Sequence, residues 1–179
     1  NNKKLTGLAA EGNRLAELDV SGNPELEELM IGDNQISYID ISHNKRLTGL
    51  TVENNRLKHI DLRNNPELTI LSASGNQLTD IDLSNNKNLR AVYLDNNRLA
   101  TVDFQGMKYL VRVHASNNQL LALTNMNMEE CTGYSVFCTP GDGLKAEGHR
   151  YVSNSRMLDL SKTVPNIQLN QIREVRGGQ

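Results

Sequence analysis

The segment KRLTGLTVENNRLKHIDLRNN, residues 45–65, is followed directly by PELTILSASGNQLTDIDLSNN, residues 66–86, which repeats its pattern. Leucine recurs every 21 residues at six places, and six units begin at residues 3, 24, 45, 66, 87 and 108 without insertion or deletion. A repeat of this length is typical of a solenoid, in which each unit forms one coil. The units are therefore numbered as coils 1 to 6, and the positions within them as columns 1 to 21.

Several columns are apolar and predict the core of the solenoid. Column 3 is always Leu, column 6 is Leu or Val, and columns 8, 13 and 16 hold only Ala, Val, Ile or Leu. Column 18 is apolar in the first five coils. Hydrophobic residues make up 37% of the chain, with no Trp and two Phe, so a regular array of aliphatic side chains must build this core.

Column 11 is Asn in every coil, although it lies among apolar columns. A buried amide needs hydrogen-bond partners. We expect each Asn to donate to a carbonyl of the next coil and to accept from a backbone N–H, which closes the turn after a short strand. Column 21 repeats the pattern in the first four coils. The column 11 ladder is Asn13, Asn34, Asn55, Asn76, Asn97 and Asn118.

The pattern L-x-x-L-x-[A/V/I/L]-x-x-N-x-L resembles the leucine-rich repeat, and the resemblance covers residues 3–128. The second half of each unit echoes the first, which is similar to the 21-residue bacterial class called IRREKO and to internalin J-type surface proteins. Those proteins often have Cys at column 8, and this chain departs from that pattern. The resemblance implies a leucine-rich repeat solenoid of six 21-residue coils. It would have a parallel β-sheet on the concave face, short β or extended strands on the other side, and a C-terminal cap.

The repeat decays toward the carboxyl end, and this predicts the domain boundaries. Column 21 becomes Met107 and Met128 in the last two coils. We expect the solenoid at 1–128, a cap coil at 129–149, and at 150–179 a junction or the start of a following β-rich, immunoglobulin-like domain. Continuing the 21-residue register places Tyr134 in column 6 and Val136 in column 8 of the cap coil. The first two residues look like the end of a preceding unit, so we expect a piece of a longer protein.

Cys131 and Cys138 are the two cysteines of the chain. We expect a disulfide that pins the cap, with two buried free thiols as the alternative. A redox or metal pair is less favoured, because two ligands do not make a zinc site and the four histidines lie in unrelated columns.

Composition and motifs argue against several classes of function. The net charge is -2 and no basic run occurs, so nothing favours nucleic acid or an anionic membrane. No apolar stretch approaches the roughly 20 residues that a membrane span needs. No catalytic set, phosphate loop or zinc motif is present, so we expect no enzyme activity and no cofactor or metal.

Column 17 holds a row of aspartates that admits two interpretations. Stacked carboxylates suggest a calcium-binding ladder, as in some parallel β solenoids. A solvated row with local turn hydrogen bonds explains them equally simply, and we favour it because the glycine-rich spacing of calcium-binding solenoids is missing. The row is Asp19, Asp40, Asp61, Asp82 and Asp103.

Columns 5, 7 and 9 are expected to point outward from the concave strands, because columns 6 and 8 point inward. Their residues vary from coil to coil, with acids in coils 1 to 3 and Tyr, Arg and His in coils 5 and 6. Tyr and Arg are enriched in interface hot spots. The predicted partner-binding residues are Glu28, Met30, Glu53, Arg90, Tyr93, Asp95, Arg112 and His114.

The sequence therefore favours a non-catalytic recognition and adhesion module of a secreted or surface-anchored bacterial virulence protein. It would lie outside the cell or at its surface, and bind a protein or glycan on host or neighbouring cells. One alternative is a structural spacer or self-association unit of a larger adhesin. Another is an accessory domain of an enzyme located elsewhere in the full-length chain.

Overall fold

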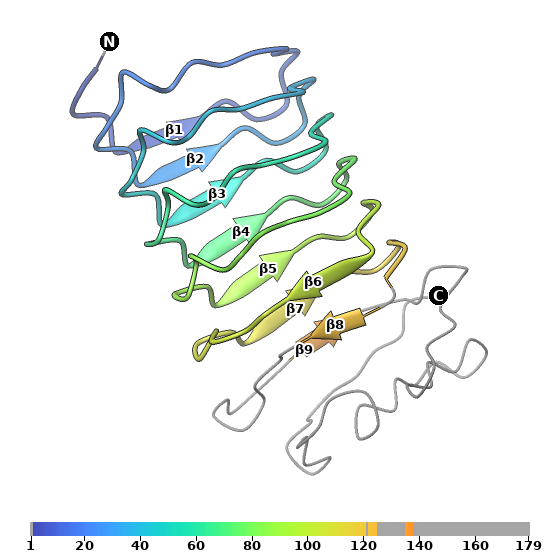
Figure 1. Ribbon diagram of the computed structural model, residues 1–179. Helices are drawn as coiled ribbons and strands as arrows, with labels where there is room; N and C mark the ends of the chain where they lie inside the picture. The colour runs from blue at the N-terminus through green and yellow to red at the C-terminus, as the bar shows by residue number, and fades with distance from the viewer. Residues whose placement is uncertain (1, 121, 125–134, 138–179) are drawn as a thin grey trace.

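The computed structural model describes residues 2–120, 122–124 and 135–137, and it shows a stack of coils with parallel strands along one side (Figure 1). In the seven-stranded sheet, neighbouring strands come from successive coils, and a second sheet has two strands, β6 and β8. The predicted solenoid with its parallel sheet is confirmed. The larger sheet contains β1 (Gly7–Ala9), β2 (Glu28–Met30), β3 (Gly49–Thr51), β4 (Ile70–Ser72), β5 (Ala91–Tyr93), β7 (Arg112–His114) and β9 (Ser135–Phe137).

The register of the larger sheet follows the sequence repeat from β1 to β7. Leu8 pairs with Leu29, Leu29 with Leu50, and so on to Val92 with Val113, always 21 residues apart. Residues of one column therefore lie side by side on neighbouring strands, about 4.8 Å apart. Any residue type that recurs in a column becomes a row along the stack.

The last strand departs from that register. Val136 pairs with Val113, a separation of 23 residues, so Val136 occupies column 6 and its predicted place in column 8 is wrong. Pairing selects Val opposite Val, the residue type of column 6, and a loop between coils tolerates two additional residues. Apart from β9, the predicted cap at 129–149, the junction at 150–179 and the pair Cys131–Cys138 lie outside the described residues.

The other side of each coil is less regular than the sheet. β6 (Thr101–Asp103) and β8 (Ala122–Thr124) occupy columns 15 to 17 of coils 5 and 6 and pair in parallel. In coils 1 to 4 the described residues of these columns form no strand. Tight turns follow them instead, in which the N–H of Asn44 donates to Ile41 O (3.0 Å) and that of Asn65 to Leu62 O (3.1 Å).

The core consists of the apolar columns that the sequence predicts. Columns 3, 6, 8 and 13 are buried throughout coils 2 to 6, and column 18 is buried in coils 1 to 5. Phe104, in column 18 of coil 5, is the largest fully buried side chain among the described residues. In coil 1 the equivalent residues of columns 3, 6 and 8 are only partly buried, because each coil covers its apolar side against a neighbour.

The asparagines of column 11 bind two coils together, as Asn76 illustrates. Its Nδ2 donates to Ala73 O (3.1 Å) in its own coil and to Val52 O (2.9 Å) in the preceding coil. Its Oδ1 accepts from the backbone N–H of Leu57 (3.0 Å), also in the preceding coil. The predicted ladder exists, but its direction is opposite to the prediction, because the amide lies against the coil before it. The same bonds recur at Asn34, Asn55, Asn97 and Asn118.

The asparagines of column 21 form a second ladder that is only half satisfied. Asn65 Nδ2 donates to the carbonyls of Ile41 (3.1 Å) and Asn44 (2.9 Å) in the preceding coil. The Oδ1 atoms of Asn44, Asn65 and Asn86 are buried and make no hydrogen bond among the described residues. This ladder therefore contributes donors alone, whereas column 11 contributes a donor and an acceptor.

Column 10 makes the turn that presents the column 11 asparagine. Its backbone φ is positive in all six coils, at 51° to 56° for Asp33, Asn54, Asn96 and Asn117 and at 66° and 68° for Gly12 and Gly75. Asn, Asp and Gly are the residue types that tolerate this conformation. At Gly75 packing adds a second constraint, because a Cβ there would collide with the side-chain amide of Asn54.

The first prediction concerns the column 11 ladder. Asn76→Ala should lower the free energy of unfolding by about 3 kcal/mol, because buried carbonyls and the Leu57 N–H lose their partner. Asn13→Ala is the matched control, since Asn13 is exposed and donates only within its own coil. Urea denaturation of both variants measures the difference. Equal losses, or no loss for Asn76→Ala, would contradict the ladder's role.

Candidate functional site

The candidate site is the outward face of the seven-stranded sheet, formed by columns 5, 7 and 9 and called the sheet face. Columns 6 and 8 are buried in coils 2 to 6, while columns 5 and 7 are exposed or half-buried, so the predicted alternation is confirmed. Column 9 differs in one coil, where Gly32 is buried beneath the side chain of Glu53. Because successive coils align by column, residues far apart in sequence become neighbours on this face.

Four of the predicted residues meet at the ends of β5 and β7, and they are called the Tyr93 cluster. Arg112 Nη1 donates to Tyr93 Oη (3.2 Å), and the rings of Tyr93 and His114 lie 5.0 Å apart with an interplanar angle of 52°. His114 Nδ1 lies 3.6 Å from Asp95 Oδ2. Asp95 Oδ1 in turn accepts the backbone N–H of Ser116 (2.7 Å). Each of the four side chains therefore has a partner that restrains it.

The electrostatics of the cluster favour a neutral imidazole and a charged guanidinium. Burial lowers the pKa of His114, the Asp95 carboxylate raises it, and the positive charge of Arg112 lowers it again, with a net lowering from 6.5. The hydrogen bond to Tyr93 raises the pKa of Arg112 above 12.5. At neutral pH the site thus offers one exposed cation beside two aromatic rings.

The other predicted residues lie outside the cluster. Arg90, just before β5, places its guanidinium carbon 5.7 Å from the centre of the Tyr109 ring. Glu28 is exposed at the start of β2 and Met30 is half-buried at its end. Glu53 is half-buried, and its Oε2 accepts the hydroxyl of Ser72 (2.7 Å). The acidic residues of coils 2 and 3 and the cluster of coils 5 and 6 are therefore two separate parts of one face.

Three exposed apolar residues near the cluster were not among the predicted partner-binding residues. Ile70, Tyr109 and Val111 expose 47%, 54% and 42% of their surface. Ile70 begins β4, in a column that holds Gly, Ala or a charged residue in the other coils. Val111 stands where the other coils have Thr, Glu or Arg. A departure from the residue type of an outward column was the signal that could have identified them.

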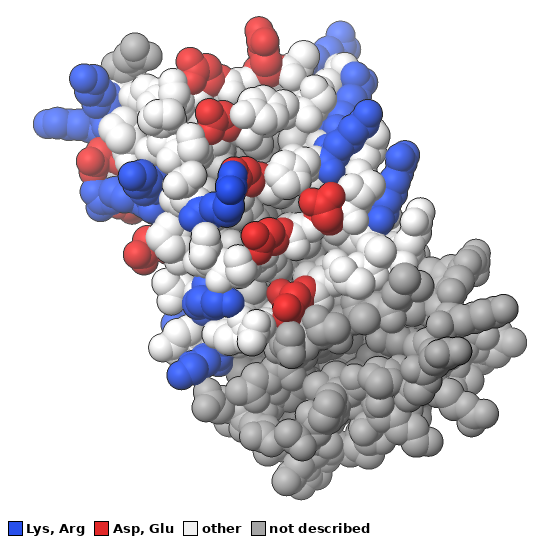
Figure 2. Space-filling model, in the orientation of Figure 1, with Lys and Arg blue, Asp and Glu red and all other residues white. Residues whose placement is uncertain are grey.

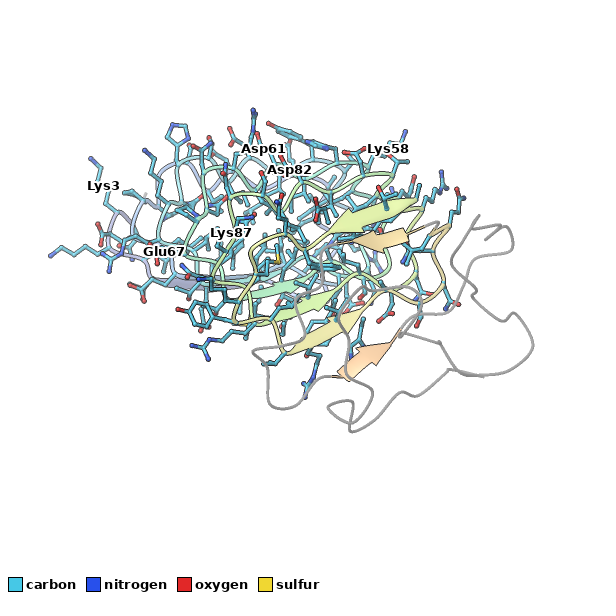
Figure 3. All side chains as sticks on the ribbon, turned by 60° about the horizontal axis from the view of Figure 1, so that its bottom comes forward. Lys3, Lys58, Asp61, Glu67, Asp82 and Lys87 are labelled. Carbon is cyan, nitrogen blue, oxygen red and sulfur yellow. The ribbon has the colours of Figure 1, made fainter. Side chains whose placement is uncertain are left out.

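The aspartates of column 17 are explained by local turns. Oδ1 of Asp19, Asp40 and Asp82 accepts the backbone N–H two residues ahead at 2.9 Å, and that of Asp61 does so at 3.0 Å. Hydrogen bonds from Arg63 lower the pKa of Asp61 to about 2. Asp61 and Asp82 follow one another on the side of the coils away from the larger sheet (Figure 3). These contacts agree with a solvated row, and within the described residues no group of three or more His, Cys, Asp or Glu could hold a metal ion.

Among the described residues, no helix is long and apolar enough to cross a membrane.

Comparisons with known proteins agree with this architecture. Residues 66–106 match the family model of leucine-rich repeats in two copies. The functional domain of InlJ from Listeria monocytogenes, which includes a cysteine ladder, superposes on 98% of this chain with a TM-score of 0.65 and 23% identity. An internalin, InlF, of the same organism covers 73% with a TM-score of 0.59 and 22% identity. A leucine-rich repeat protein of Leptospira interrogans covers 76% with a TM-score of 0.61 and 22% identity.

The fold is thus a leucine-rich repeat solenoid, and its structure is similar to that of internalins. The chain spans 39% to 43% of the length of these structures. No curated protein matches the sequence significantly.

The second prediction concerns the protonation of His114. Asp95→Asn should lower the pKa of His114 further, because it removes the carboxylate that favours the imidazolium and leaves burial and Arg112 in place. Asp61→Asn, on the other side of the coils, should leave the value unchanged. Titration of the imidazole by NMR measures both variants. A rise of the pKa in Asp95→Asn would contradict the contact.

Proposed function

We propose that this chain is a non-catalytic recognition module of a secreted or surface-anchored bacterial protein, whose sheet face binds a partner protein. The leucine-rich repeats and the internalin-like fold support a role in protein interaction in general. The residues of columns 5, 7 and 9 support this location, because they vary from coil to coil while the core columns repeat. The scaffold leaves these positions free to be complementary to a partner.

The observation that carries the proposal is the gathering of exposed apolar residues beside the Tyr93 cluster. The described residues expose four large hydrophobic side chains, and Ile70, Tyr109 and Val111 all belong to columns 2 to 5 of coils 4 and 6. Single exposed apolar residues are common, but a group of them beside a polar cluster is typical of an interaction site. These residues would form the apolar part of the contact.

The restraint of the Tyr93 cluster is a second support. Tyr93, Asp95, Arg112 and His114 hold one another through a hydrogen bond, an ion pair and a ring contact. A side chain that is already ordered loses less conformational entropy when a partner binds. Tyr and Arg that are held in this way have the properties of interface hot spots.

The charges of the sheet face indicate the chemistry of the partner. Glu11, Glu28 and Glu53 lie in coils 1 to 3, whereas Arg90 and Arg112 lie in coils 5 and 6. A complementary surface would present apolar side chains to Ile70 and carboxylates to the two arginines, with basic residues over coils 1 to 3. A protein surface offers this combination of groups more readily than a glycan does.

The biological setting is part of the same proposal. A surface protein with this fold would use the sheet face for adhesion to host or neighbouring cells, at the cell surface or after secretion. A spacer or self-association unit of a larger adhesin is the second candidate, and sedimentation of the purified chain separates it from a monomeric binder. An accessory role beside an enzyme domain elsewhere in the full-length protein is the third.

The third prediction tests the sheet face directly. Tyr93→Ala with Arg112→Glu should weaken binding to a partner at least about tenfold, because it removes an ordered ring and inverts the charge beside it. The control is Tyr38→Ala with Arg63→Glu, which makes the same chemical changes at exposed residues away from the sheet face. Both proteins and the unchanged chain would be applied to an array of purified extracellular proteins and glycans, and dissociation constants measured for each hit.

The expected result is a protein whose binding the first variant loses and the control keeps, with equal melting temperatures for all three chains. Equal weakening by both variants would contradict the location of the site. Binding confined to glycans, or association of the chain with itself through these residues, would contradict a protein partner.

A further inference from the structure

A row of unpaired arginines lies on the loops that follow the strands of the larger sheet. Seven arginines occur among residues 2–120, and Arg46, Arg63, Arg90 and Arg112 each contact another side chain. The other three make no side-chain hydrogen bond or ion pair within the part of the chain that the structure describes. These three are Arg14, Arg56 and Arg98, and all of them stand in column 12.

Column 12 alternates strictly between Arg and Gln along the stack. Arg occupies it in coils 1, 3 and 5, and Gln35, Gln77 and Gln119 occupy it in coils 2, 4 and 6. Lys58, in column 14 of coil 3, adds a further exposed cation to the row. Arg14, Arg56, Lys58 and Arg98 are called the basic ridge. Figure 2 shows Lys and Arg side chains in a row down the right-hand edge of the stack, beyond the arrowheads of the strands in Figure 1.

The backbone beneath the basic ridge is fixed from coil to coil. The N–H of Arg56 donates to Ile36 O (2.9 Å) and that of Arg98 to Leu78 O (2.8 Å), both in the preceding coil. Gln35 and Gln77 make the same bond, at 2.8 and 2.9 Å. The guanidinium groups are therefore anchored about 10 Å apart, twice the spacing of hydrogen-bonded strands, over a total of about 19 Å. Figure 3 shows Lys58 at the opposite edge of the coils from Lys3 and Glu67.

Acidic residues flank the basic ridge on both sides and narrow the surface that attracts an anion. Asp33 lies in column 10 on one side, and Glu17 and Asp80 lie in column 15 on the other. A wide polyanion such as duplex DNA would meet these carboxylates as well as the arginines. A thin chain that follows the row would meet the cations alone, and amides stand between them as neutral donors and acceptors.

We infer that the basic ridge binds a linear anionic polysaccharide, with its carboxylate or sulfate groups on alternate coils. The planar guanidinium matches such oxyanions in a bidentate geometry. A polysaccharide with one acidic group per disaccharide repeats its charge at an interval similar to that of the arginines, and its hydroxyls suit the glutamines. Single-stranded nucleic acid is less well matched, because stacked aromatic rings usually hold its bases and columns 12 to 14 contain none. This site is separate from the sheet face and does not depend on the proposed function.

The fourth prediction tests the ridge with a substitution that the repeat itself uses. Arg14→Gln, Arg56→Gln and Arg98→Gln together place in coils 1, 3 and 5 the residue that coils 2, 4 and 6 already have. The control replaces Arg46, Arg63 and Lys87 by Gln, which removes the same charge elsewhere. The full 179-residue chain is titrated against end-labelled decasaccharides of heparin and of hyaluronan at several salt concentrations. Oligothymidylate and polyglutamate serve as the nucleic-acid and acidic-peptide probes.

The ridge variant should bind at least about tenfold more weakly and show a shallower salt dependence, because fewer counterions are released. The control should stay within about twofold of the unchanged chain, and Gln35→Arg with Gln77→Arg should bind more tightly. Heparin binding alone assigns sulfate as the anion, and hyaluronan binding extends the site to carboxylates. Absence of binding to both, equal loss in the control, or binding of oligothymidylate or polyglutamate as tight as that of the sugars would overturn the inference. Melting temperatures verify that each variant is folded.

Discussion

The hydrogen bonds of the column 11 asparagines are the interaction on which the rest of the solenoid depends. After each short strand the chain must turn, and the turn leaves buried carbonyls and N–H groups without a strand partner. Each asparagine in coils 2 to 6 satisfies such groups in two coils at once, since its Nδ2 donates in both directions and its Oδ1 accepts from the coil before. The side chain therefore fixes the turn and the contact between coils together. Replacing the amide by an apolar group would leave several buried polar groups unpaired.

This constraint separates scaffold from surface within every coil. Asn at column 11, Asn, Asp or Gly at column 10 and aliphatic residues at the core columns are required by the stack, whereas columns 5, 7, 9 and 12 are not. The unconstrained columns nevertheless inherit the regular spacing of the coils. A partner can thus meet rows of side chains at fixed intervals, on the sheet face in one direction and on the basic ridge in another.

Much of this architecture was predictable from the sequence because the repeat is uninterrupted. The core columns, the buried asparagines and the outward columns follow from periodicity, and the proximity of Tyr93, Arg112 and His114 follows from their columns. The direction of the ladder did not follow, because column assignment does not say which neighbouring coil a side chain faces. Val136 was misplaced because strand pairing, which can absorb two additional residues in a loop, overrides a fixed count. Arg90 left the predicted cluster because the Tyr109 ring attracts its guanidinium. The basic ridge escaped a search for basic runs, since its arginines lie 42 residues apart in the sequence.

Amide hydrogen exchange measured by NMR tests the ladder most directly. The backbone N–H groups of column 13 belong to no strand, and in coils 1 to 5 they donate to the asparagine Oδ1 of the following coil. If the ladder holds the coils together, the amides of Ile36, Leu57, Leu78 and Leu99 exchange as slowly as those of the neighbouring strands, because both require the coils to separate. Exchange as fast as that of exposed turn amides would contradict this account, since the turns would then open while the sheet stays closed.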